Sequence, residues 1–175
     1  MRDILFDADA FIFIRKLSVL RLLARSSGRW LMTSHIARHE LNDVSEEIAA
    51  FENDGRLLVH ATLGKDPLFR KLKKEGHHVG EAEAIAWAAQ LEVDARPLFI
   101  SADKGARDGA KNNGVPVGDL MDLVVEAVES GDVDRAAVRE KVAVWDDKHQ
   151  MLGRPSDYTT FDDTFERRRQ ARGRR

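Results

Sequence analysis

Short apolar segments alternate with helical segments along most of the chain, and this alternation constrains the fold more than any other feature. The apolar segments predict strands at residues 4–6, 30–33, 57–61, 97–100 and 115–117. Strands that alternate with helices are typical of a parallel sheet covered on both faces. The sequence therefore predicts an α/β fold of three layers, α/β/α, with a central parallel sheet of four or five strands. The predicted helices are residues 10–14, 19–25, 35–41, 46–51, 67–75, 81–92 and 119–129.

The alternation is complete by about residue 130, which suggests the domain organisation. We expect an α/β domain over residues 1–130, a helical extension over residues 131–150 and an irregular, arginine-rich tail over residues 151–175. No apolar stretch approaches the roughly 18 residues of a membrane span, and the acidic N-terminus does not fit a signal peptide. The chain has no cysteine, which excludes disulfides and cysteine-ligated zinc. These features favour a cytoplasmic protein.

The charge of the chain is unevenly distributed. The net charge is −2, but residues 167–175, RRRQARGRR, hold six of the 28 basic residues, and the rest carries 22 basic and 30 acidic residues. An acidic body with a basic tail indicates either a polyanionic partner or a tail that folds back on the body. A solvated, disordered terminus is the third interpretation. Our hypothesis is that Arg167, Arg168 and Arg169 contact nucleic acid.

Five acidic side chains fall where the carboxyl ends of the predicted strands meet. Asp7 and Asp9 follow the first strand, Glu40 lies soon after the second, Glu81 begins an alanine-rich helix, and Asp103 follows the fourth strand. Ligands of open parallel sheets bind at this edge. Clustered carboxylates repel one another unless they share a hard divalent cation, which can orient water and stabilise charge on a phosphate. The arrangement indicates hydrolysis of a phosphate ester, although each acid alone also fits a helix cap or a surface charge.

Four segments carry a family resemblance by their order and spacing: ILFDADAFI, SHIARHEL, GEAEAIAWA and FISADKGAR. Over roughly residues 1–130 they resemble the PIN-domain nucleases, closest to the bacterial branch that includes the VapC-type toxins. The resemblance implies an endoribonuclease that depends on Mg²⁺ or Mn²⁺ and hydrolyses phosphodiester bonds of RNA, as the toxin of a toxin–antitoxin pair. It also implies the metal-binding acids, which are Asp7, Glu40, Glu81 and Asp103, with Asp9 assisting.

The sequence departs from the family pattern in two places. Ala102 stands where the pattern often has a second acid directly before the last aspartate, and the chain continues well beyond residue 130. Glu83 is the second acid of the alanine-rich helix, but a spacing of two residues turns it away from Glu81.

RNA is the expected partner, with DNA, a cognate antitoxin and a second copy of the chain left open. The basic side chains expected to contact nucleic acid are Lys71, Lys74, Lys104 and Arg107, besides the three arginines of the tail.

Two other functions fit parts of the sequence. A phosphatase of the haloacid-dehalogenase type would use Asp7 as nucleophile and Asp9 as acid, but it gives Glu40 and Glu81 no role. A PIN-like fold without catalytic activity would serve as an RNA- or protein-binding module, which the complete acid set argues against. A zinc site at His35 and His39 lacks a third ligand in the sequence.

Overall fold

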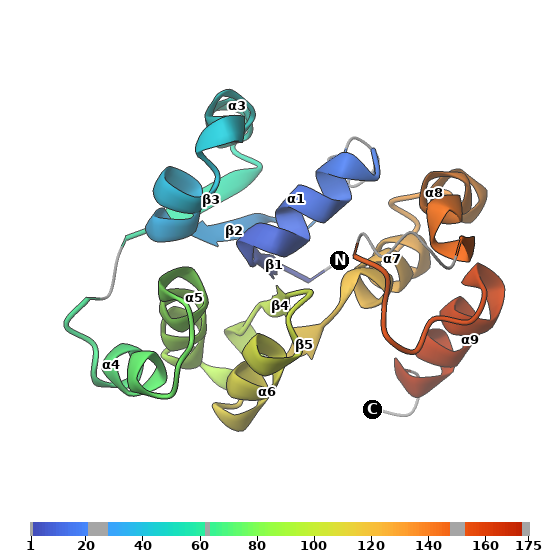
Figure 1. Ribbon diagram of the computed structural model, residues 1–175. Coiled ribbons are helices and arrows are strands. Elements are labelled where there is room, and N and C mark those ends of the chain that lie inside the picture. The colour runs from blue at the N-terminus through green and yellow to red at the C-terminus, as the bar shows by residue number, and fades with distance from the viewer. Residues whose placement is uncertain (1, 21–27, 62–63, 148–152, 173–175) are drawn as a thin grey trace.

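Five short parallel strands form the centre of the fold in the computed structural model, which describes residues 2–20, 28–61, 64–147 and 153–172. Their order in the sheet is β3-β2-β1-β4-β5 (Figure 1). The three residues of β1 and of β4 and the four residues of β2 are buried, as expected of parallel strands covered on both faces. The strands are β1 (Ile4–Phe6), β2 (Trp30–Thr33), β3 (Leu57–His60), β4 (Leu98–Ile100) and β5 (Val117–Gly118).

Helices cover both faces of this sheet. Helices α1 and α3 lie on one face and α5 and α6 on the other, which confirms the predicted three-layer α/β/α fold (Figure 1). Of the helix predicted at residues 19–25, residues 21–25 lie outside the described part of the chain. The helical elements are α1 (Ala8–Lys16), η1 (Ile36–Glu40), η2 (Asn42–Val44), α3 (Ser45–Asn53), α4 (Pro67–Lys74), α5 (Val79–Ala89), η3 (Val93–Ala95), α6 (Lys104–Asn112), α7 (Leu120–Glu129), α8 (Arg135–Val142), η4 (Ala143–Asp146) and α9 (Phe161–Arg172).

The fifth strand begins later than the sequence predicted. We expected residues 115–117, but β5 is Val117–Gly118. The Val115 N–H donates to the Ala110 carbonyl at 3.0 Å and so belongs to the turn that ends α6. Pro116 has no N–H, and its carbonyl is the first group of this segment to bond to β4, accepting from the Phe99 N–H at 2.8 Å.

The end of the chain is more ordered than the sequence predicted. Residues 161–172 form helix α9, so the expectation of an irregular segment is wrong for this part of residues 151–175. The Thr160 hydroxyl accepts the Asp163 N–H at 3.2 Å at the start of the helix. Phe161, Thr164 and Phe165, spaced three and four residues apart, are buried on one face, and α9 packs against α7 and η4. The dense charge after Phe165 hid this helical pattern.

The C-terminal elements belong to the same apolar core as the sheet. Trp145 is fully buried, and its ring meets that of Tyr158 edge to face with centroids 5.6 Å apart. Tyr158 in turn donates its hydroxyl to Asp146 Oδ1 at 2.8 Å. These contacts fix the segment before α9 to η4. Within the described ranges, no helix is long and apolar enough to cross a membrane.

Candidate functional site

The carboxyl ends of β1, β4 and β5 place three polar side chains next to one another. Phe6 and Ile100 are register partners, as are Ile100 and Gly118. The residues that follow these three strands, Asp7, Ser101 and Asp119, therefore neighbour each other at one edge. Backbone hydrogen bonds extend both strand pairs by one residue: Asp7 N–H donates to Ile100 O at 3.1 Å, and Ser101 N–H to Gly118 O at 3.3 Å.

Asp7 is the buried acid of this edge. Its residue is 4% exposed, and its Oδ2 accepts the Ser101 hydroxyl at 2.7 Å. Burial raises the pKa of Asp7 to about 7; the Ser101 hydrogen bond opposes the rise, while the nearby charges of Glu81 and Asp9 add to it. The charged groups that act on Asp7 are thus acidic. A carboxylate in this setting is poised to accept a cation.

Glu81 lies in the first turn of α5, and its charge acts on Asp7. The residue is 9% exposed, and its Oε2 accepts the His78 N–H at 3.1 Å. His77 Nδ1 lies 3.6 Å from the same oxygen. The Glu81 side chain is therefore held by the first turn of its own helix. It caps the start of this helix, as the sequence also allowed.

Glu40 joins the same region through a close contact between its side chain and the backbone of Gly80. It ends the π-helix η1, and its Oε1 accepts the Gly80 N–H at 3.2 Å. His35 Nε2 lies 3.5 Å from that oxygen. A Cβ at Gly80 would collide with Glu40 Oε1 and with Ile36 Cγ1, so only glycine allows this contact without a shift. Glu40 is thereby held one residue away from Glu81.

Glu83 has a different environment from Glu81. It is fully buried, and its Oε2 accepts the His35 N–H at 3.1 Å, so it holds the segment that leads from β2 into η1. Among the described residues, its Oε1 has no hydrogen-bond partner. The Glu83 carboxylate thus supports the backbone that carries Glu40.

Asp103 lies at the exposed side of the edge. Its Oδ1 accepts the Ala106 N–H at 2.7 Å and caps α6, as one of the two sequence interpretations expected. Its own N–H donates to Ser101 Oγ at 3.0 Å. Ser101 therefore links Asp7 to the segment of Asp103. Sequence reasoning missed Ser101 and Gly80; the position of a serine directly after β4, in register with Asp7 after β1, was the available signal.

The donor set suits a hard cation, although the carboxylates are held by other groups. Within the described residues, no three His, Cys, Asp or Glu side chains lie close enough together to hold a metal ion. Asp7, Glu40, Glu81 and Asp103 each accept a hydrogen bond from a hydroxyl or a backbone N–H. The buried carboxylate of Asp7 beside Glu81, with oxygen donors alone, is the arrangement that fits Mg²⁺ or Mn²⁺.

The basic side chains fall into two groups. Lys104, Lys71 and Lys74 are exposed, and Arg107 donates through Nη1 to the Ser101 carbonyl at 2.6 Å. The arginines of the tail instead meet carboxylates of the protein. Arg167 lies 3.3 Å from Asp157, and Arg169 lies 2.8 Å from Glu166. Arg168 lies 2.8 Å from Asp119, which follows β5, so the tail folds back on the body.

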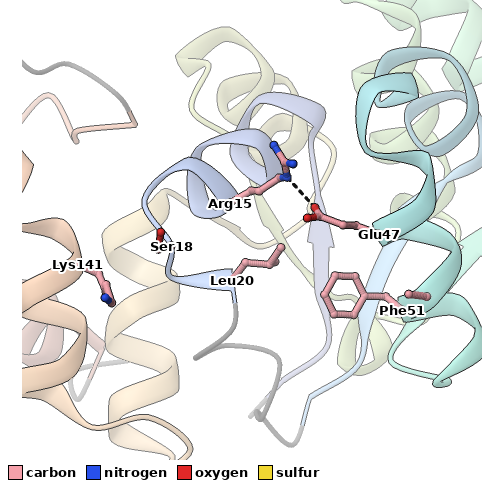
Figure 2. A pocket seen from close by; sticks show the side chains of 7 residues that line it. Arg15, Ser18, Leu20, Glu47, Phe51 and Lys141 are labelled. Carbon is pink, nitrogen blue, oxygen red and sulfur yellow. Dashed lines mark hydrogen bonds and ion pairs between the residues drawn. The ribbon is translucent and has the colours of Figure 1, made fainter.

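A cavity of about 800 Å³ lies away from these acids (Figure 2). It is lined by Arg15 and Ser18 at the far end of α1, by Glu47 and Phe51 of α3 and by Lys141 of α8. The Arg15 and Glu47 side chains are paired at 2.6 Å. Asp7 precedes the opposite end of α1, so this cavity includes none of the predicted site residues.

Comparison with known proteins identifies the family of the chain. Comparisons with curated proteins and with solved structures found no match. A family model described as a PIN domain matches residues 3–152. PIN domains are generally nucleases, and they typically use divalent metals. The match spans the sheet and all five acids of the carboxyl edge, and the chain belongs to this family of PIN domains.

Proposed function

We propose that this protein is an endoribonuclease that depends on Mg²⁺ or Mn²⁺ and hydrolyses internal phosphodiester bonds of RNA. The observation that carries the proposal is the buried Asp7 carboxylate, which accepts the Ser101 hydroxyl and lies within the electrostatic influence of Glu81. Family membership supports the nuclease class. It also sets aside the phosphatase interpretation, which has no role for Glu40 or Glu81.

Asp7 and Glu81 would hold the metal, with Glu40, Asp103 and Asp9 as the remaining oxygen donors. A bound divalent cation supplies charge neutralisation for a phosphate and lowers the pKa of water. The residues of the chain provide the positioning. Ser101 fixes one oxygen of Asp7, and the His78 N–H fixes one oxygen of Glu81. The second oxygen of each carboxylate would bind the metal.

Lys104 and Arg107, beside Asp103, would contact the RNA backbone nearest to the reaction, with Lys71 and Lys74 of α4 as outer contacts. Phosphate contacts add affinity without sequence information. Any cleavage preference must therefore come from groups that touch the bases.

The test is cleavage of a 5′-labelled, single-stranded RNA, with DNA of the same sequence in parallel. We expect internal cuts in RNA with Mg²⁺ or Mn²⁺ and none in excess EDTA. Full activity in EDTA would contradict the proposal. No activity on any RNA, together with tight RNA binding, would favour a binding module without catalytic activity.

The biological role we propose for this activity is that of a toxin. Expression of the protein should then stop growth, and a small protein encoded beside it should relieve the arrest by forming a complex. Asp7→Asn is the matched control and should permit normal growth. Light scattering of the purified chain would show whether two copies associate. Normal growth with active enzyme would overturn the toxin role while leaving the nuclease activity standing.

A further inference from the structure

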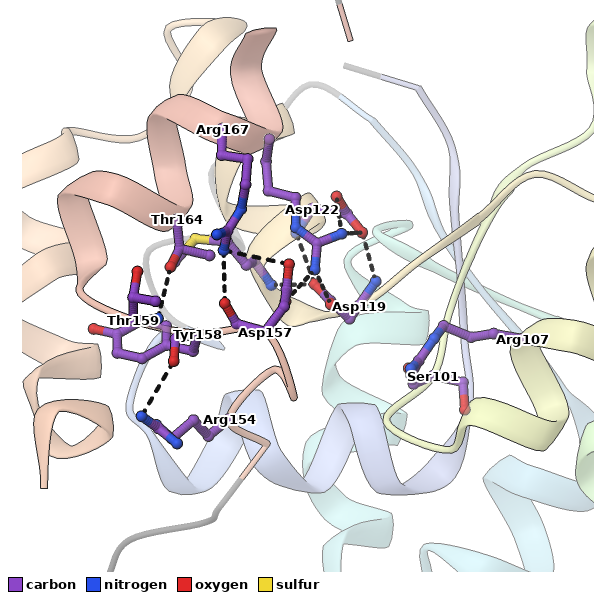
Figure 3. A network of polar contacts seen from close by, with 12 residues as sticks. Ser101, Arg107, Asp119, Asp122, Arg154, Asp157, Tyr158, Thr159, Thr164 and Arg167 are labelled. Atoms are coloured by element: carbon purple, nitrogen blue, oxygen red, sulfur yellow. Dashed lines mark hydrogen bonds and ion pairs between the residues drawn. The ribbon is translucent and has the colours of Figure 1, made fainter. Parts of the chain in front are cut away.

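A second cavity, of about 330 Å³, lies beside Asp103 and is walled partly by the segment that precedes α9. Its volume is at the lower end of the range for small-ligand sites, large enough for one nucleotide unit. Figure 3 shows its arginines, Arg107 from α6 and Arg154 from the C-terminal segment, in one view. Its lining includes Ala102, Lys104, Arg107, Asp119, Gly153 and Arg154.

The charges around this cavity favour an anion. Lys104, Arg107 and Arg154 are three cations, and in the described part of the chain none of them forms an ion pair with a carboxylate. Arg107 donates to the Ser101 carbonyl, and Arg154 donates to the Trp145 carbonyl at 2.8 Å. Hydrogen bonds to carbonyls orient a guanidinium without neutralising its charge. Both arginines therefore keep their charge for a ligand.

The acidic side chain of the cavity is already neutralised. Asp119 Oδ1 accepts the backbone N–H groups of Met121 and Asp122 at 2.9 and 3.1 Å, and its Oδ2 accepts Arg168 Nη2 at 2.8 Å. A carboxylate with this set of donors offers little repulsion to an incoming anion. The arginine of α9 thus offsets the charge of the carboxylate that lines the cavity.

The C-terminal wall of the cavity is fixed by packing. Arg154 Nη2 donates to the Tyr158 carbonyl at 3.3 Å, and its guanidinium lies 5.0 Å from the centre of the Tyr158 ring. Gly153 has φ +64°, and a Cβ there would collide with Leu120 and crowd Phe13. A preformed wall costs little ordering free energy when a ligand binds.

From these contacts we infer that the cavity binds one phosphate group of the RNA, next to the linkage that is cut, and that Arg154 supplies a phosphate contact from outside the three layers. The inference rests on the proposed nuclease function. Arg107 is anchored to Ser101, whose hydroxyl donates to Asp7, so a phosphate held there lies beside the acid site. Guanidinium groups suit phosphate because several N–H groups point in fixed directions.

Binding without catalysis tests this inference. The Kd of a fluorescent single-stranded RNA is measured in EDTA with the Asp7→Asn protein, with and without a second substitution. We expect Lys104→Ala and Arg154→Gln each to weaken binding about fivefold or more. Each should also reduce the slope of log K against log salt by about 0.7, the value for one phosphate contact on a single strand.

Matched controls separate this effect from a general change of charge or fold. Lys111→Ala removes an exposed lysine from the other end of α6, and Arg139→Gln removes an exposed arginine of α8. Both should leave the Kd and the salt slope unchanged. Lys104 is exposed, so its variant remains informative if Arg154→Gln lowers the Tm.

The outcomes distinguish this inference from the proposed function. Equal affinities for Lys104→Ala, Arg154→Gln and the controls would overturn the phosphate site, even if RNA is cleaved. If RNA does not bind but inorganic phosphate does, and Lys104→Ala abolishes that binding, the site stands and the RNA substrate is wrong. If neither RNA nor phosphate binds, the site is overturned.

Discussion

Two clusters of carboxylates lie near the same edge of the sheet, and they differ in what neutralises them. Asp7 and Glu81 are both buried, and the charged groups acting on Asp7, Glu81 and Asp9, are acidic. Asp119 and Asp122, by contrast, meet Arg168 of α9 at 2.8 and 3.4 Å. Figure 3 shows the side chains of Asp119, Asp122 and Asp157 gathered around one guanidinium. The second cluster carries its own cation. Under the proposed function, the first cluster would take up an external one.

The second cluster is a structural ion-pair network. Burial raises the pKa of Asp122, as does the charge of Asp119, and Arg168 opposes both effects. Arg172 extends the network to Glu126 on the next turn of α7. These pairs attach α9 to α7 beside the buried Phe161 and Phe165. A cluster of acids therefore indicates a functional site only where no basic side chain of the protein forms ion pairs with it.

Removing the charge of Asp7 should have the largest effect. Asp7→Asn keeps an oxygen that can accept the Ser101 hydroxyl but loses the negative charge that binds a cation. We expect cleavage to fall at least about 10³-fold, or roughly 4 kcal/mol, because the metal supplies several kcal/mol of transition-state stabilisation. Initial rates on labelled RNA measure it.

The same variant also tests the electrostatic difference between the clusters. A buried carboxylate beside two other acids costs folding free energy at neutral pH in the absence of metal. The Tm of Asp7→Asn in EDTA should equal or exceed that of the unmodified chain. A clearly lower Tm would mean that Asp7 is neutralised within the protein, and the contrast between the two clusters would be lost.

Breaking the second cluster should reduce stability. Arg168→Ala leaves three carboxylates without their shared cation, two of them largely buried. We expect a loss of about 2–3 kcal/mol in the free energy of unfolding, or about 4–10 °C in Tm. Urea denaturation measures it. Arg169→Ala is the control, because its pair with Glu166 is exposed and should change the free energy of unfolding little. Similar losses in both variants would contradict the network.

The two glutamates of α5 provide a comparison within one helix. Glu81→Gln removes a proposed metal ligand and should lower the cleavage rate about 10–100-fold, or roughly 1.4–2.7 kcal/mol. Glu83→Gln keeps an oxygen for the His35 N–H and should change the rate only a fewfold. Parallel rate measurements at saturating Mn²⁺ decide between them. The reverse order would assign Glu83 to the metal.

The sequence was sufficient for the layers, the parallel sheet and the edge at which the acids lie. These features depend on the period of apolar residues and on the alternation of strands with helices along the chain, which are local patterns. It was insufficient for the partners of individual carboxylates. Glu40 meets Gly80 across 40 positions, and Asp119 meets Arg168 across 49, so both contacts depend on how distant segments pack. The arginine run illustrates this limit, since its composition alone fits RNA and the acids of α7 equally well.

The smallest expected effect comes from the contact that holds Glu40. In Gly80→Ala the new Cβ overlaps Glu40 Oε1 and Ile36 Cγ1, and Glu40 can move away more easily than the buried Ile36. Glu40 then loses the Gly80 N–H and its place beside Glu81. We expect the cleavage rate to fall about five- to tenfold, or roughly 1–1.4 kcal/mol, with the Tm lowered by only a few degrees. Gly64→Ala is the control, because a Cβ at Gly64 meets nothing within 4 Å. An unchanged rate in Gly80→Ala would remove Glu40 from the acid site and leave Asp7 and Glu81 as its two buried members.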